Sequence, residues 1–133
     1  MFTNYEENLL LNHILGGAAY TNPATWYLAL YTATPGELGG GTECVGGAYA
    51  RVTLTNNTTN FPTTTTGTKS LGVAAAFAEA TNNWGTITGF ALCDAASGGN
   101  ICMYGNLTTP VVIAQGDVAR VAVGTSGIVL TLD

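Results

Sequence analysis

The chain has 133 residues, of which 47% are apolar and only 8% are charged, and its net charge is −5. This length suits a single domain, residues 1–133, with one hydrophobic core. The three cations are too few and too dispersed to bind a nucleic-acid backbone, and no apolar run approaches the roughly 20 residues that span a membrane. So few charges predict a neutral surface, typical of a protein that packs against copies of itself or a larger assembly.

The first predicted element is a helix in NYEENLLLNHILGG, residues 4–17. Asn4 is its expected N-cap, with Glu7 three residues later as in a capping box. Gly16 and Gly17 allow the left-handed residue that commonly ends a helix. A helix of about three turns is not stable alone, so we expect residues 1–17 to act as a docking helix whose apolar face is covered by the rest of the domain or by a partner. That face consists of Leu10, Leu11, Ile14 and Leu15.

After the helix the apolar period changes to two, which predicts strands. TWYLALYTA (25–33) alternates Trp26, Leu28 and Leu30 with Tyr27, Ala29 and Tyr31, and AYARVTLT (48–55) alternates in the same way. TPGELGGGTE (34–43) between them is a glycine-rich loop, and the Thr/Asn-rich stretch 56–69 is extended or a long loop. LGVAAAFAEA (71–80) is rich in alanine, a helix former, but its β-rich setting favours a strand.

The second half of the chain reads as further strands. GTITGFALCD (85–94) and NICMYGNL (100–107) are joined by AASGG, residues 110–123 give an edge strand, a turn at 115–117 and another strand, and GIVLTLD (127–133) closes the chain. Several short strands without helical crossovers predict a mainly β protein, an antiparallel β-sandwich or jelly roll with one short N-terminal helix.

The stretch 94–100 raises the question of a reactive site, because Cys93 and Asp94 are adjacent. Turn chemistry accounts for it better. The short carboxylate of Asp94 can accept backbone N–H groups, Gly98 and Gly99 supply positive φ values, and Asn100 tolerates such a value. We interpret this stretch as a hairpin with a structural turn.

The search for catalytic, cofactor-binding or metal-binding residues yields no candidate set. His13 is the only histidine and lies within the predicted helix, so no Cys–His nucleophile is indicated. The stretch ELGGGTE (37–43) lacks the Gly-Lys-Ser/Thr ending of a phosphate loop. Glu37 and Glu43 at its two ends are not part of an alternating Asp/Asn ladder that would bind calcium. The three cysteines, Cys44, Cys93 and Cys102, are expected to be free buried thiols, with a Cys93–Cys102 disulfide as the alternative.

The motifs NYEENLLLNHILGG, YTNPATWYLALYTATPGELGGGTE, GGAYARV, WGTITGFALCDAASGGN, YGNLTTP and the later GD occur in this order along the chain. In this it resembles a family of small virion structural proteins of tailed bacteriophages, often labelled phage tail fibre protein. It is also similar in size and type to capsid cement, or decoration, proteins. The resemblance covers almost the whole chain, and residues 56–80 depart from it most.

The resemblance implies a non-enzymatic virion protein on the capsid surface or tail, assembled in the host cytoplasm. Our first interpretation is a trimeric cement protein that binds the major capsid protein, and the second is a tail fibre or tail-hub component that binds other tail proteins. The low charge itself favours a homotrimer. A third class is a carbohydrate-binding module, and an enzyme ranks last. The module would stack sugars on Tyr20, Trp26, Tyr27, Tyr31 or Tyr49.

Overall fold

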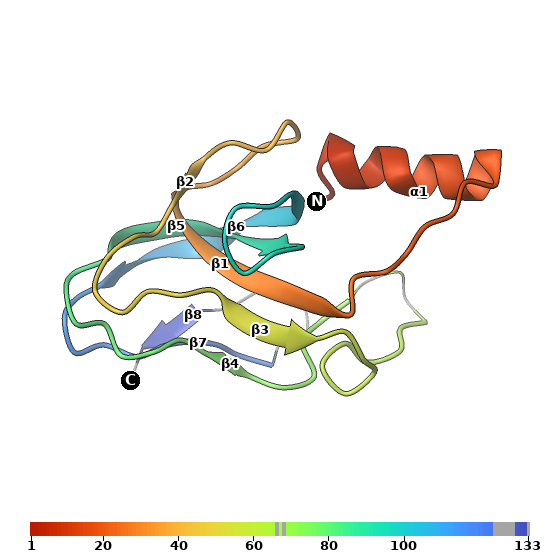
Figure 1. The fold of residues 1–133 in the computed structure, drawn as a ribbon. Coiled ribbons are helices and arrows are strands. Elements are labelled where there is room, and N and C mark those ends of the chain that lie inside the picture. The colour runs from red at the N-terminus through yellow and green to blue at the C-terminus, as the bar shows by residue number, and fades with distance from the viewer. Residues whose placement is uncertain (66, 68, 124–129, 133) are drawn as a thin grey trace.

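A computed structural model describes residues 1–65, 67, 69–123 and 130–132. These residues form one helix and two antiparallel sheets that face each other, with the helix projecting to one side (Figure 1). The elements are α1 (Asn4–Gly16), β1 (Thr25–Ala33), β2 (Thr42–Glu43), β3 (Val52–Thr55), β4 (Ala75–Ala76), β5 (Gly85–Cys93), β6 (Ile101–Ile113), β7 (Ala119–Val121) and β8 (Leu130–Leu132). The predicted mainly β antiparallel fold with one N-terminal helix is confirmed.

The larger sheet has the order β2-β1-β5-β6, with β3 also paired to β1, and the smaller sheet has the order β4-β7-β8. All pairs are antiparallel. The main core lies between the sheets, where Leu28, Leu30 and Ile87 of the larger sheet pack with Ala119 and Val121 of the smaller one. Burial of these apolar side chains is the main source of stability.

The central strand β1 has the predicted bounds and the predicted alternation. Trp26, Leu28 and Leu30 enter the main core. Ala29 and Tyr31 face the opposite way and belong to a second buried cluster on the outer face of the larger sheet. Because both faces of β1 are covered, its burial is nearly continuous, although its sequence alternates.

Several strand boundaries differ from the prediction. The strand expected at 48–55 begins only at Val52, because Ala48 has a left-handed φ of 66° and the preceding residues form a turn. The strand expected at 71–80 is reduced to the two residues of β4. Part of the predicted loop 34–43 pairs with β1 as β2. Of the segment 127–133, β8 covers 130–132, and residues 127–129 and 133 lie outside the described part of the chain.

The strands expected at 100–107 and from 110 onwards are one continuous strand, β6. Ile87 and Gly89 of β5 pair with Val111 and Asn106, so β6 contains an irregularity between these two positions. Pro110 lies within it, on the edge strand of the sheet, where a missing N–H is tolerated. The turn expected at 115–117 follows and leads to β7.

The first residues of the chain extend the edge of the larger sheet. Phe2 forms a bridge with Met103, the Met1 ammonium donates to the carbonyl O of Tyr104 at 2.7 Å, and Tyr104 N–H donates back to Met1 O at 2.9 Å. The helix therefore starts directly at β6. Within the described residues no helix has the length and apolar character needed to cross a membrane.

Candidate functional site

The N-terminus of α1 is fixed to the sandwich by Thr3. Its N–H donates to Cys102 O at 2.9 Å, and its hydroxyl donates to Ile101 O at 2.5 Å. Thr3 is also the N-cap, with its side-chain oxygen accepting from Glu6 N–H at 3.5 Å, so the predicted cap at Asn4 is one residue too late. Because Thr3 is hydrogen-bonded to β6, the helix is capped at the point where it joins the sheet. The N–H of Asn4 donates to Glu37 O of the glycine-rich loop at 2.8 Å.

Glu6 is the one buried residue of the helix, and its burial was not predicted from the sequence. Tyr20, from the segment that returns to β1, donates its hydroxyl proton to the Glu6 carboxylate. Burial, followed by this hydrogen bond, raises the pKa of Tyr20 well above its ordinary value. The spacing of Thr3 and Glu6, Thr-x-x-Glu, is the signal that identifies the true helix start.

The four predicted docking residues do not share one environment. Leu11, Ile14 and Leu15 lie together on a face of α1 that the described residues leave uncovered, with 53%, 70% and 81% of their surface exposed. Leu10 is half-buried, so it is not part of this exposed set. We call Leu11, Ile14 and Leu15 the helix ridge. The helix ends as predicted, with Gly17 at a φ of 67° and Ala18 N–H donating to Asn12 O at 3.0 Å.

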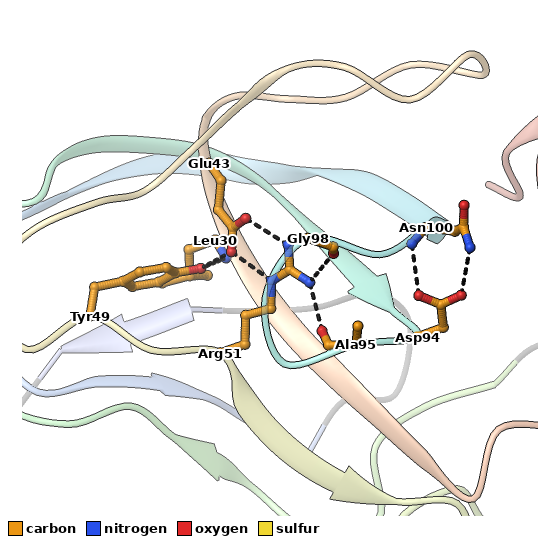
Figure 2. Close-up of polar contacts among 8 residues, drawn as sticks. All are labelled: Leu30, Glu43, Tyr49, Arg51, Asp94, Ala95, Gly98 and Asn100. Atoms are coloured by element: carbon orange, nitrogen blue, oxygen red, sulfur yellow. Dashed lines mark hydrogen bonds and ion pairs between the residues drawn. The ribbon is translucent and has the colours of Figure 1, made fainter.

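The turn 94–100 has a defined set of contacts (Figure 2). The two carboxylate oxygens of Asp94 accept from the backbone N–H of Asn100 at 2.7 Å and from its side-chain amide at 2.8 Å. Gly98 and Gly99 have φ values of 60° and 70°, whereas Asn100 has no positive φ. A Cβ at Gly99 would lie 2.5 Å from Asp94 Oδ1, so glycine is needed there for space as well as for conformation.

A second polar network holds this turn to the rest of the sheet, and sequence reasoning missed it. Arg51 Nε and Nη2 donate to the two carboxylate oxygens of Glu43 at 2.8 and 2.7 Å. Arg51 Nη1 donates to the carbonyl oxygens of Ala95 and Gly98 at 2.7 and 2.9 Å. Figure 2 shows the guanidinium between the Glu43 carboxylate and the turn. The guanidinium therefore joins the end of β2 to the turn between β5 and β6.

The electrostatics of this network favour the ionised pair. The side chain of Arg51 is only 6% exposed and that of Glu43 is 26% exposed. The hydrogen bonds to Glu43 raise the pKa of Arg51. Burial raises the pKa of Glu43, but the hydrogen bonds from Arg51 and Tyr49 and the Arg51 charge outweigh it, so the net pKa is lowered. The network is therefore a permanent structural clamp at neutral pH.

Tyr49 links the clamp to the core. Its hydroxyl donates to Glu43 Oε1 at 3.0 Å and accepts from Leu30 N–H at 3.0 Å. Its ring lies edge-on to Trp84 at 5.3 Å and is stacked with Phe77 at 6.1 Å. The hydroxyl and the ring of Tyr49 are thus both engaged in contacts within the protein, so the ring is not free to stack on a sugar.

Two of the other aromatic residues considered for sugar stacking are also unsuited to it. Trp26 and Tyr31 are buried, with 6% and 3% of their surface exposed, and Tyr20 and Tyr27 are half-buried. Sugar stacking needs an accessible ring face. The structure therefore contradicts the assumption that Trp26 and Tyr31 are exposed rings.

The groups that most often carry chemistry are placed for structural roles. Cys44, Cys93 and Cys102 are free and buried. Burial raises the pKa of Cys44 to about 11 and also raises the pKa values of Cys93 and Cys102, whereas a nucleophilic thiol requires a lowered value. His13 is exposed, with Nδ1 2.7 Å from Ala18 O at the end of the helix. The described residues contain no group of His, Cys, Asp and Glu able to hold a metal ion.

These observations define a small antiparallel β-sandwich whose polar sites hold its loops in place and whose N-terminal helix projects with an apolar ridge. Residues 1–128 match the model of the family described as podophage GP4 fiber I protein gp80. The chain belongs to this family. No curated protein matches it. Membership in a phage fibre family supports a structural role in the virion, in agreement with the resemblance noted in the sequence.

Proposed function

We propose that the chain is a non-enzymatic structural component of a phage tail fibre, and that it joins its neighbours through α1. The observation that carries this proposal is the helix ridge. The first turn of α1 is fixed to β6 and to Glu37, while Leu11, Ile14 and Leu15 point away from the sandwich and are exposed. A helix of 13 residues is marginal on its own, so a neighbour that covers the ridge also stabilises the helix.

A non-enzymatic role is supported by the placement of the reactive side chains. The thiols are buried and shifted towards the protonated form, and His13 interacts with the backbone. The acidic residues that accept the most hydrogen bonds, Glu43 and Asp94, hold loops together. A homotrimer is part of the proposal, because a surface with so few charges offers little electrostatic protection against association.

We propose a tail fibre ahead of capsid cement. The sequence led us to rank cement first, with the major capsid protein as the partner, and a tail component second. The description of the family as a fibre protein supports our placing the tail component first, and other tail proteins are then the proposed partners. Cement on the head shell is the alternative outcome of the experiment below.

The experiment is to locate and count the chain in purified virions. Immunogold electron microscopy with antibodies against the folded protein should label the tail, and quantitative mass spectrometry should give a copy number close to that of other tail proteins. Labelling of the head, with a copy number close to that of the major capsid protein, would exclude the fibre assignment and support cement.

The role of the helix in assembly is tested in the same particles. Ile14→Glu places a charge on the ridge without changing a contact to the sandwich, because Ile14 is 70% exposed. We expect the variant to fold and to be lost from virions. The control is Asn12→Glu, which adds the same charge at an exposed position two residues from Ile14, on the opposite side of the helix from that side chain. Equal incorporation of both variants would contradict docking through α1.

A further inference from the structure

The sandwich has an apolar hollow that opens to solvent between its two layers. Its volume is about 270 Å³. Its walls join the main core and include Leu28, Leu54, Phe61, Leu71, Leu92 and Met103. A cavity of about 150 Å³ accommodates a benzene-sized group, so this hollow has room for at least one leucine-sized side chain. We call it the core hollow.

The apolar side chains of the helix ridge are suited to fill such a hollow. Leu11, Ile14 and Leu15 are spaced by three and four residues, so they line one face of α1. At a rise of about 1.5 Å per residue, Leu11 lies roughly 10 Å beyond the first helical residue. The ridge therefore stands clear of the junction with the sandwich, as the projecting helix in Figure 1 shows.

The ridge is not able to reach the core hollow of its own chain. Met1 and Phe2 line that hollow, but the next residue, Thr3, is bonded to Ile101 and Cys102, and Asn4 N–H is bonded to Glu37 O. These bonds set the direction in which the helix leaves the sheet. Folding the helix back over the hollow would break them. The ridge and the hollow of one chain are therefore both left open within the described residues.

The charges beside the two surfaces are complementary. Glu7 is exposed and lies four residues before Leu11 and seven before Ile14, so its carboxylate is on the same face of the helix as the ridge. Lys69 is exposed and lines the core hollow, where its ammonium donates to the carbonyl oxygens of Phe61 and Pro62. A ridge that approaches the hollow with Glu7 beside Lys69 places opposite charges together.

We propose that the helix ridge of one copy of this chain inserts into the core hollow of a second copy. The contact is heterologous, because it joins two different surfaces, the helix ridge of one copy and the core hollow of the next. Such a contact forms a ring where the rotation closes and a filament where it does not, and the homotrimer proposed above is the ring of three copies. The inference rests on the proposed structural role, in which many copies assemble, and it names the surfaces through which they do so.

The first experiment measures the mass of the purified full chain by light scattering over a range of micromolar concentrations. The wild type should be a multimer of the 13.6 kDa protomer. Leu11→Glu and Ile14→Glu should each weaken association at least about a hundredfold, since each loses a buried leucine-sized contact and introduces a charge. The matched control, Asn12→Glu, should associate as the wild type does. Circular dichroism melts establish that each variant is folded.

The second experiment tests the head-to-tail geometry by mixing. Ser70 lines the core hollow and is half-buried, so Ser70→Glu blocks the hollow and leaves the ridge intact, whereas Ile14→Glu does the reverse. Each variant alone should be monomeric. An equimolar mixture should form a 1:1 dimer that does not grow, because one functional ridge and one functional hollow remain. Lys69→Glu, at an exposed residue that also lines the hollow, provides a second variant if Ser70→Glu fails to fold, because it places a like charge opposite Glu7.

Two results would overturn the inference. A wild-type chain that stays monomeric at these concentrations would mean that a different protein covers the ridge. A failed mixing experiment is the second result: if Ser70→Glu associates on its own, the helices pair with each other and not with the hollow, and if the monomeric variants do not combine, the ridge does not enter the hollow. Neither result bears on the proposed location of the protein in the tail. Conversely, labelling of the head would reject the fibre assignment but would not change the outcome of the mixing experiment.

Discussion

Replacing Arg51 with methionine tests the clamp between Glu43 and the turn 94–100. The change removes four hydrogen bonds, two to the Glu43 carboxylate and two to the carbonyl oxygens of Ala95 and Gly98. Methionine retains most of the apolar length of the arginine, so the packing of the stem is largely kept. The loss of stability in Arg51→Met therefore measures the contribution of the polar contacts.

The expected loss of stability follows from the burial of the Arg51–Glu43 ion pair. Removing one partner of a buried ion pair costs about 3–5 kcal/mol, because the other charge is left uncompensated. Glu43 is 26% exposed, so water recovers part of its hydration, and we expect Arg51→Met to lower the free energy of unfolding by about 2–4 kcal/mol. For a domain of this size the melting temperature should fall by roughly 10 °C.

The assay is thermal and urea unfolding of the wild type, Arg51→Met, Glu43→Gln and the double variant. Removing both charges leaves neither one buried alone, so the double variant should recover stability relative to the sum of the single losses, with a coupling of about 1–3 kcal/mol. A cost below about 0.5 kcal/mol for Arg51→Met, the level of an ordinary surface substitution, would refute the assignment of the clamp as a buried structural contact.

The pH dependence of the same variants checks the sign of the interaction. The folded pKa of Glu43 is lowered from its ordinary value of 4.5. The clamp therefore adds stability above the unfolded pKa, and this contribution is lost as the pH falls through the lower folded pKa. We expect the stability difference between the wild type and Arg51→Met to be constant near neutral pH and to shrink below about pH 5. A difference that grew with acid would contradict the direction of the shift.

Three further predictions concern the turn and the helix start. Gly98→Val should cost about 1–3 kcal/mol because of its positive φ, and Gly99→Val should cost more, because its Cβ also meets the Asp94 carboxylate; equal melting temperatures would count against this account. Asp94→Ala should lower the free energy of unfolding by about 1–3 kcal/mol in urea titrations, whereas an unchanged titration midpoint would mean that the turn does not depend on its carboxylate. Thr3→Ala should cost about 1–2 kcal/mol as the loss of a helix cap, and Asn4→Ala much less; the reverse order in thermal melts would restore Asn4 as the cap.

The features that sequence predicted well are those that depend on neighbouring residues. The alternation in TWYLALYTA placed β1 with its observed bounds, because period two is a property of the strand itself. The positive φ of Gly17 at the end of α1 is likewise a local requirement. Patterns of this kind are visible in one sequence without knowledge of the fold.

The features that sequence missed depend on contacts between distant segments. Arg51 alternates correctly for a strand, but its position is set by Glu43 and by carbonyl groups more than forty residues later, so it lies before β3 and not within it. Pro110 normally indicates a strand boundary, yet β6 continues through it because an irregularity opposite β5 accommodates it. The exposure of Leu11, Ile14 and Leu15 follows from the direction of the helix, which is fixed by bonds to β6.

The attachment of the N-terminus to β6 also has a consequence for the order of events during synthesis. Met1 and Thr3 are bonded to residues about one hundred positions later in the chain, a separation that slows folding because a long loop must close first. A ribosome-bound or truncated chain that lacks β6 has no anchor for the helix. Its ridge is then not held in the direction that a neighbour would recognise. If the helix docks as proposed, assembly then requires a chain that is complete through β6, and the fold would keep unfinished subunits out of the growing structure.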